Sequence, residues 1–409
     1  MPIFFNFKST VLWLSLIVLA CGQKQPSNAI ASTQDATIKI DTAIVVAANR
    51  TTEYLPLLKN KKIAVVANQT SVIVKQNGHA HLVDSLLAHE IAVKKVFAPE
   101  HGFRGRADAG EKVSDGVDVK TGVPLISLYG KNRKPTPDQL SDIDLVLFDI
   151  QDVGVRFYTY IATLQLVMEA CAAAEIPVIV LDRPNPNGHY VDGPTMEKAH
   201  TSFLGMTEIP LVYGMTIGEY ATMINEERWL EGGLKAKLTV IPLKNYAHTA
   251  RYSLAIRPSP NLPNDKAINL YPSLGLFEGT SINAGRGTSS QFQRYGASFL
   301  DSTVYNFQYV PEPNFGAKYP KEQGLICYGK DLSQEPFRNE MTLAYLLDAY
   351  KNCPDKSKFF KTAGFTKHAG TETLQKQIME GLTEEEIKAS WQPQLEEFKR
   401  LRNNYLLYP

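Results

Sequence analysis

Short apolar runs, each followed by a polar loop, set the strongest limit on how this chain can fold. They occupy residues 62–67, 91–97, 125–128, 143–150 and 178–181. Their length and their β-branched side chains are typical of buried strands. Amphipathic stretches with the spacing of helices separate several of these runs, at residues 50–60, 81–90 and 163–175. Strands and helices that alternate in this way fold as right-handed parallel crossovers. We therefore predict an α/β fold with a Rossmann-like, mostly parallel sheet.

Beyond about residue 200 the alternation becomes less regular. A helix is expected at residues 216–229, and proline-rich loops follow it. The last third mixes short strands with charged helices near residues 340–351 and 384–401. Because 409 residues are enough for two globular domains, we expect a Rossmann-like α/β catalytic domain over residues 41–245. A smaller α+β C-terminal domain over residues 246–409 is expected to close the cleft.

The N-terminus is typical of an exported protein. An apolar run at residues 11–20 is shorter than the roughly 20 residues that a membrane-spanning helix needs, and it ends at Cys21 in a sequence that resembles a bacterial lipobox. We predict a lipoprotein signal peptide over residues 1–21, lipidation of Cys21 after cleavage, and a small, polar, flexible tether over residues 22–40. The alternative is an ordinary cleaved signal. Both place the mature chain outside the cytoplasm, and the lipobox favours a membrane-anchored lipoprotein facing the periplasm.

Composition and missing motifs argue against several functions. The formal net charge is +1, so no broad basic field points to nucleic acid. There is no CxxC, HExxH or His-rich tract, so neither a metal site nor another cofactor is expected. The chain lacks a GxSxG elbow and P-loop spacing, which disfavours serine acyl transfer and nucleotide binding. Pairing of Cys327 with Cys353 is left open by the sequence.

Polar side chains directly follow four of the predicted strands. The segments concerned are residues 68–71, 97–111, 151–158 and 182–188. Ligands of open α/β sheets bind at the carboxyl ends of the parallel strands. Carboxylates can protonate a glycosidic oxygen, amides can bind sugar hydroxyls, and arginine can pair with an anionic sugar substituent. These side chains favour a carbohydrate-active enzyme.

Several long motifs resemble one bacterial family. They are FAPEHGFRGRADAGE, SLYGKNRKPT, LVLFDIQDVGVRFYTYIATL, VLDRPNPNG, VDGP, YGMTIGE, RPSPNLPN and EGTSINAGRGT. The family is that of exo-β-N-acetylmuramidases of the NamZ type, formerly a domain of unknown function, and the resemblance runs from about residue 45 to the C-terminus. It implies a Rossmann-like domain, a smaller C-terminal domain and an active cleft between them. It also implies hydrolysis of the β-1,4 bond of non-reducing terminal N-acetylmuramic acid in peptidoglycan fragments, during cell-wall turnover.

The resemblance assigns roles to individual residues. Glu100, in the Pro-Glu-His-Gly motif, is the expected general acid/base. Asp149 and Asp152 are candidates for a second acid, and Arg183 and Asn185 for recognition of the lactyl carboxylate or the acetamido group. The full set of expected substrate-binding residues is Asn68, Gln69, His101, Arg104, Gln151, Tyr158, Arg183, Asn185, Glu278 and Arg286.

Structural roles are the alternative for several of these side chains. Glu100 could merely orient its loop through Arg104 or backbone amides. Asp149 and Asp152 could cap turns, and Tyr158 could belong to the core. Two other functions also stay open at this point. One is a non-catalytic muropeptide-binding lipoprotein. The other is an esterase or amidase of peptidoglycan, which would need a metal or an activated nucleophile.

Overall fold

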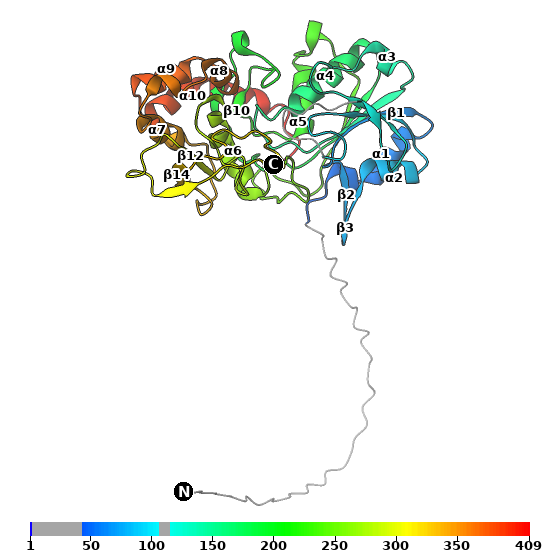
Figure 1. Ribbon diagram of the computed structural model, residues 1–409. Helices are drawn as coiled ribbons and strands as arrows, with labels where there is room; N and C mark the ends of the chain where they lie inside the picture. Colours follow the sequence, from blue (N-terminus) through cyan, green and yellow to red (C-terminus); the bar gives the residue numbers. More distant parts are fainter. Residues whose placement is uncertain (2–42, 106–114) are drawn as a thin grey trace, which may run out of the picture. The chain divides into compact units, whose positions relative to one another are not determined.

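The computed structural model describes Met1, residues 43–105 and residues 115–409. Apart from Met1, the predicted signal peptide, the tether and the lipidation site at Cys21 lie outside the described residues. Residues 43–409 form one compact unit (Figure 1). Within the described residues, no helix is long and apolar enough to cross a membrane.

A seven-stranded sheet forms the centre of the α/β part. Its strands, in spatial order, are β11 (Leu238–Ile241), β8 (Val178–Leu181), β7 (Leu145–Asp149), β1 (Lys62–Ala67), β4 (Ala92–Ala98), β6 (Pro124–Ser127) and β5 (Gly116–Val117). All neighbours pair in parallel except β5, which is antiparallel to β6. The prediction of a mostly parallel sheet is therefore confirmed, and β1 and β8 have the predicted bounds.

Helices cover both faces of this sheet because both faces are apolar. In β1, Ile63 and Val65 belong to one buried cluster, and Ala64 and Val66 belong to the other. This alternation follows from the two-residue period of a strand. Helices α1 (Thr51–Leu58) and α2 (Leu82–Ala88) pack in the first cluster, and α4 (Tyr160–Ala173) and α5 (Ile217–Glu226) in the second. These helices confirm the predicted alternation.

Local sequence fixes where some helices begin. In α5 the backbone N–H of Glu219 donates to the Thr216 hydroxyl at 3.2 Å, and the Glu219 carboxylate accepts from the Thr216 N–H at 2.8 Å. This capping box satisfies two N–H groups that have no partner within the helix. The short helix α3 (Pro137–Leu140) and the long helix α10 (Glu384–Arg402) begin in the same way.

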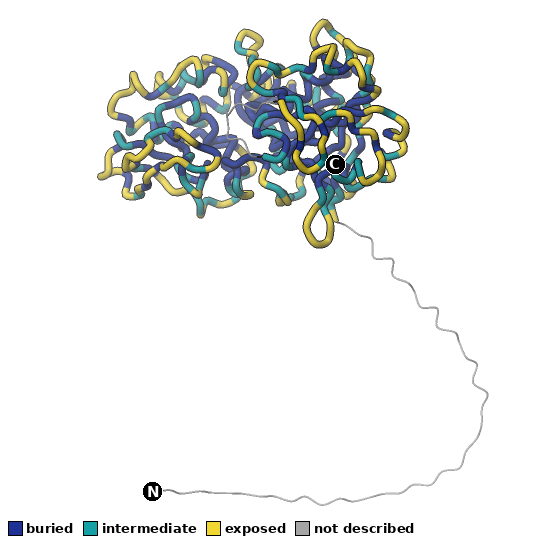
Figure 2. Tube along the Cα trace, turned by 45° about the vertical axis from the view of Figure 1, so that its right-hand side comes forward, coloured by how far each residue is buried: buried dark blue, intermediate teal, exposed yellow. Residues whose placement is uncertain are grey.

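The C-terminal part contains helices and a small antiparallel sheet. The helices are α6 (Asp265–Leu274), α7 (Ala344–Lys351), α8 (Thr362–Ala369), α9 (Thr373–Glu380) and α10, and the strands are β12 (Arg294–Ala297), β14 (Cys327–Asp331) and β13 (Phe307–Tyr309). The larger buried cluster runs through both parts of the chain, from Val146 in β7 to Trp391 in α10. Buried segments accordingly fill the interior on both sides of Figure 2. The domain boundary at residue 246 stays a prediction.

The last residues of the chain return to the α/β part. The Tyr408 hydroxyl donates to Asp182 Oδ2 at 2.6 Å and accepts from the Leu243 N–H at 2.8 Å. The His248 N–H donates to the carbonyl of Pro409 at 2.8 Å. The last residues therefore form hydrogen bonds to the end of β8 and to the segment that follows β11.

Several elements, among them a hairpin and a helix, and one pairing question were not settled by the sequence. The hairpin of β2 (Val72–Lys75) and β3 (Gly78–His81) was missed, although Asn77-Gly78 is a known hairpin signal. Helix α6 was missed because it follows a proline-rich loop and contains a proline itself. The cysteines of the described part, Cys171, Cys327 and Cys353, are buried free thiols, so the last two do not pair.

Candidate active site

A pocket of about 340 Å³ lies where the carboxyl ends of β4 and β6 meet the C-terminal part. The α/β part contributes Glu100, His101 and Tyr129 and the segment before α4. The C-terminal part contributes Tyr271, Glu278, Arg286 and His368. Two carboxylates, five aromatic residues and two guanidiniums thus line one hollow of the size of a sugar unit.

Glu100 is placed just beyond the end of β4 and is held by hydroxyl groups. The Tyr129 hydroxyl donates to Glu100 Oε1 at 3.0 Å, and the Thr159 hydroxyl donates to Oε2 at 3.3 Å. A hydroxyl can donate to a carboxylate or accept from a carboxylic acid, so these two contacts suit both protonation states of Glu100. The next residue, His101, is buried and has a φ of 69°, an uncommon conformation that turns the chain sharply after Glu100.

Glu278 is held as an anion. Arg286 Nε donates to Glu278 Oε1 at 3.0 Å, and Lys321 Nζ donates to the backbone carbonyl of Glu278 at 3.2 Å. Burial opposes ionisation of Glu278, but the charges of Arg286, Lys321 and His368 outweigh it and lower the pKa of its carboxyl to about 2. The two carboxyls of the pocket therefore differ in kind, since Glu278 is fixed as a carboxylate and Glu100 is held by groups that tolerate either state.

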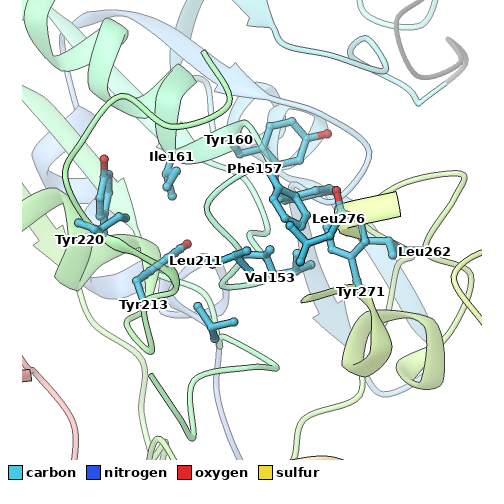
Figure 3. Packing of buried hydrophobic residues seen from close by; sticks show 14 of the residues in the cluster. Val153, Phe157, Tyr160, Ile161, Leu211, Tyr213, Tyr220, Leu262, Tyr271 and Leu276 are labelled. Carbon is cyan, nitrogen blue, oxygen red and sulfur yellow. The ribbon is translucent and has the colours of Figure 1, made fainter. Parts of the chain in front are cut away.

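Aromatic side chains form one wall of the pocket. The rings of Phe157 and Tyr271 meet edge to face, with centroids 5.1 Å apart (Figure 3). Tyr158 packs edge-on against Tyr160 and Tyr271 and donates its hydroxyl to the Pro258 carbonyl at 2.7 Å. Tyr158 therefore belongs to the core, as the structural alternative for it had suggested, and it also lines the pocket. Its role in binding substrate stays a prediction.

Asp149 and Arg183 do not reach the pocket. They form a buried bidentate ion pair, with Nε to Oδ1 at 2.6 Å and Nη2 to Oδ2 at 2.8 Å, and Arg183 also donates to the Val72 carbonyl at 3.1 Å. Asp149 is the last residue of β7 and has no exposed surface. The geometry does not support Asp149 as a second acid or Arg183 as the ligand of a lactyl carboxylate. The carboxylate of Asp149 and the guanidinium of Arg183 are already paired with each other.

Asp152 and Gln151 stabilise the turn after β7 instead of lining the pocket. Asp152 Oδ2 accepts from the Gly154 N–H at 2.6 Å and from the Tyr213 hydroxyl. Burial raises the pKa of Asp152 to about 7, although these hydrogen bonds act in the opposite direction. The Gln151 amide donates to the carbonyls of Asp152 at 2.7 Å and Pro184 at 2.6 Å. The turn-capping alternative accounts for Asp152, and Gln151 supports the backbone of the same turn.

Arg104 is also occupied elsewhere. Its guanidinium pairs with Asp84 at 2.9 Å and with Asp118 at 2.7 Å, and it lies over the ring of Phe103 at 4.4 Å. These contacts tie the loop after β4 to α2 and to the segment after β5. Arg104 does not line the pocket.

The three remaining predicted amides, Asn68, Gln69 and Asn185, support the backbone. Asn68 Oδ1 accepts from the N–H and the hydroxyl of Thr70 at 2.8 and 2.6 Å. The Gln69 amide donates to the Pro258 carbonyl at 3.0 Å, and the buried Asn185 amide donates to a backbone carbonyl at 2.8 Å. None of the three lines the pocket. Their hydrogen bonds give them structural roles.

The structure thus brings only part of the predicted set together. Those that line the pocket are Glu100, His101, Tyr158, Glu278 and Arg286. Sequence reasoning missed Tyr129, although it directly follows the predicted strand at residues 125–128. It also missed Thr159, Tyr271 and His368, for which the sequence carries no distinctive local signal.

Comparisons with known proteins match the whole described fold. The N-terminal model of the family "Exo-beta-N-acetylmuramidase NamZ" matches residues 63–266, and its C-terminal model matches residues 269–408. A relative from Bacillus subtilis, described as "Peptidoglycan beta-N-acetylmuramidase NamZ", is 36% identical over 423 residues, which cover 99% of each chain. Two crystal structures of DUF1343 family proteins from Bacteroides fragilis are also similar. One is 44% identical with a TM-score of 0.82, and the other is 27% identical with a TM-score of 0.77; each match covers 90% of this chain and 99% of that protein.

Proposed function

Because the chain belongs to the exo-β-N-acetylmuramidase NamZ family, we propose that the pocket between Glu100 and Glu278 is where it carries out that family's reaction. The chain is a glycoside hydrolase that removes N-acetylmuramic acid from peptidoglycan. The observation that carries the assignment of the pocket is the pair of unlike carboxyls in one sugar-sized hollow. Such a pair is what most glycoside hydrolases use.

We assign the proton transfer to Glu100. As a carboxylic acid it gives its proton to the glycosidic oxygen when the bond to the anomeric carbon breaks, and the resulting carboxylate takes a proton from the water that completes hydrolysis. Tyr129 and Thr159 suit this cycle because their hydroxyls can donate to the carboxylate and accept from the acid. The loop that carries Glu100 stays in place through the ion pairs of Arg104.

We assign the second carboxylate to Glu278. The transition state of glycoside hydrolysis has positive charge at the anomeric carbon, and a fixed anion nearby stabilises that charge. The Arg286 and Lys321 contacts and a pKa of about 2 support this role. In this assignment Glu278 replaces Asp149 and Asp152, whose hydrogen bonds lie within the fold.

Turnover of a defined disaccharide tests the function itself. Purified chain incubated with the peptide-free disaccharide of N-acetylmuramic acid and N-acetylglucosamine is expected to release both monosaccharides, as measured by chromatography with mass detection. A muropeptide-binding protein without activity would bind the disaccharide in calorimetry and release neither sugar. An esterase or amidase would leave the disaccharide intact and would act only on fragments that carry acyl or peptide groups.

Substitution of Arg286 by methionine is expected to change the pH dependence of the reaction. With Arg286 present, Glu278 is ionised throughout the working range because its pKa is about 2. Without the guanidinium, burial raises the pKa of Glu278, so the required anion is lost as the pH falls through the new value. We expect kcat/KM to fall more at about pH 5 than at about pH 8; a new pKa about one unit above pH 5 would make that difference about tenfold.

Arg286→Lys is the matched control, because it keeps a cation beside Glu278. It is expected to retain the acid limb of the wild type even if its overall rate is lower. An equal loss of kcat/KM at all pH values in Arg286→Met would count against the role of Arg286 in holding Glu278 ionised.

We propose that the enzyme works outside the cytoplasm as a lipoprotein anchored through Cys21. The support is the apolar run at residues 11–20 and the lipobox-like sequence that ends at Cys21. Cys21→Ala is expected to abolish incorporation of labelled palmitate and to move the protein out of the detergent-extracted membrane fraction. Ser27→Ala, a few residues later, is the control and should behave as the wild type. Unchanged membrane association of Cys21→Ala would contradict the anchor.

A further inference from the structure

A second hollow adjoins the active-site pocket. We call it the side groove; it has a volume of about 500 Å³ and is lined by residues 131–134, 201–203, Leu166 and Met206. Arg133, Ser202 and Phe203 line both the side groove and the active-site pocket. The guanidinium of Arg133 lies 4.3 Å from the centre of the Phe203 ring, so these two side chains form the rim between the two hollows.

The side groove presents positive charge that the fold leaves available. Within residues 43–105 and 115–409, no carboxylate forms an ion pair with Lys131 or Arg133. The neighbouring Lys134 differs, because it pairs with Glu169 at 3.0 Å and Glu231 at 2.6 Å. Lys131 and Arg133 can therefore pair with a ligand, whereas Lys134 stabilises the fold.

The remaining wall is suited to a sugar chain. Leu166, Phe203 and Met206 supply apolar surface, and the hydroxyls of Thr201 and Ser202 lie beside it. The amide of Asn132 is already used, since it donates to the Ser127 carbonyl at 2.9 Å. Apolar surface next to hydroxyls matches the faces and edges of a sugar ring, and the two cations match a carboxylate attached to it.

We propose that the side groove binds a carboxylate-bearing continuation of the substrate, with Lys131 and Arg133 as the cations that recognise it. The proposal rests on the proposed function, because it takes the active-site pocket to hold the terminal muramic acid. Every muramic acid carries a lactyl group that ends in a carboxyl. A longer glycan therefore offers a second carboxylate beyond the bond that is cut, and a stem peptide on the terminal sugar offers carboxylates as well.

The test compares substrates of different length in one preparation. The quantity measured is the ratio of kcat/KM for the peptide-free tetrasaccharide to kcat/KM for the peptide-free disaccharide. We expect the wild-type ratio to exceed one. Lys131→Gln should lower the ratio about threefold, as is usual for an exposed charge pair, and the charge reversal Lys131→Glu about tenfold. Lys59→Gln is the control and should keep the wild-type ratio. Lys59 is an exposed lysine that directly follows α1, near the end of β1 that lies away from the active-site pocket.

A parallel arm identifies the source of the carboxylate. It repeats the comparison with the disaccharide carrying a stem peptide in place of the tetrasaccharide. A lower ratio in Lys131→Glu than in the wild type, in either arm, supports the side groove as a carboxylate site. The arm in which the ratio falls identifies the source of the carboxylate. Identical ratios in wild type, Lys131→Gln and Lys131→Glu in both arms would overturn the proposal. Failure of the wild type to release sugar from any substrate would instead overturn the proposed function.

Discussion

Glu100→Gln is expected to lower kcat for release of N-acetylmuramic acid about 10²- to 10⁴-fold, the usual contribution of general acid/base catalysis. Glutamine has the same shape and its carbonyl can still accept from the Tyr129 hydroxyl, but it has no proton to give. We expect KM to change little, because the pocket walls stay as they are. Initial rates with the natural disaccharide measure the effect.

A substrate with an activated leaving group separates proton donation from a general loss of activity. In an aryl β-N-acetylmuramide whose phenol has a low pKa, the phenolate leaves without being protonated. Glu100→Gln should therefore lose much less of the bond-breaking rate on this substrate. Glu385→Gln, in the exposed first turn of α10, is the control for a lost surface charge. Equal losses on the aryl and the natural substrate would show that Glu100 is not the proton donor.

Arg183→Met is expected to lower the free energy of unfolding by about 3–5 kcal/mol, as is typical when one member of a buried ion pair is removed. The substitution leaves the carboxylate of Asp149 at the end of β7 without its bidentate partner and without water. Urea unfolding followed by circular dichroism measures the loss.

The double variant Asp149→Asn with Arg183→Met isolates the interaction. Because it removes both charges, it should be more stable than Arg183→Met alone, so the two single losses will not add. A loss below about 1 kcal/mol in Arg183→Met would mean that the pair contributes no more than a surface pair does. In that case the two side chains would again be candidates for binding substrate.

Much of the α/β part could be predicted because its strands are buried on both faces. Strands of this kind are continuous apolar runs in the sequence, and β1 and β8 were located to the residue. The ends of the strands were harder to interpret. Glu100 and Asp149 both follow apolar runs, yet Asp149 is the last residue of its strand and Glu100 lies two residues beyond β4. That small difference decides which carboxyl faces the pocket.

The C-terminal half of the site could not be derived from local patterns. Arg183, the partner of Asp149, lies 34 positions further along the chain, and no periodicity indicates such a pairing. Tyr271 and His368 reach the pocket from helices α6 and α8, through contacts between distant segments. Glu278 and Arg286 were placed in the cleft by family resemblance, and only their geometry distinguishes a fixed anion from a proton donor.

The position of Tyr408 has a consequence for how the protein is made and handled. The end of β8 is complete only when Tyr408 has reached Asp182, so the α/β part cannot finish folding before the segment around Tyr408 has left the ribosome. For the same reason an affinity tag fused directly after Pro409 would crowd a structural contact.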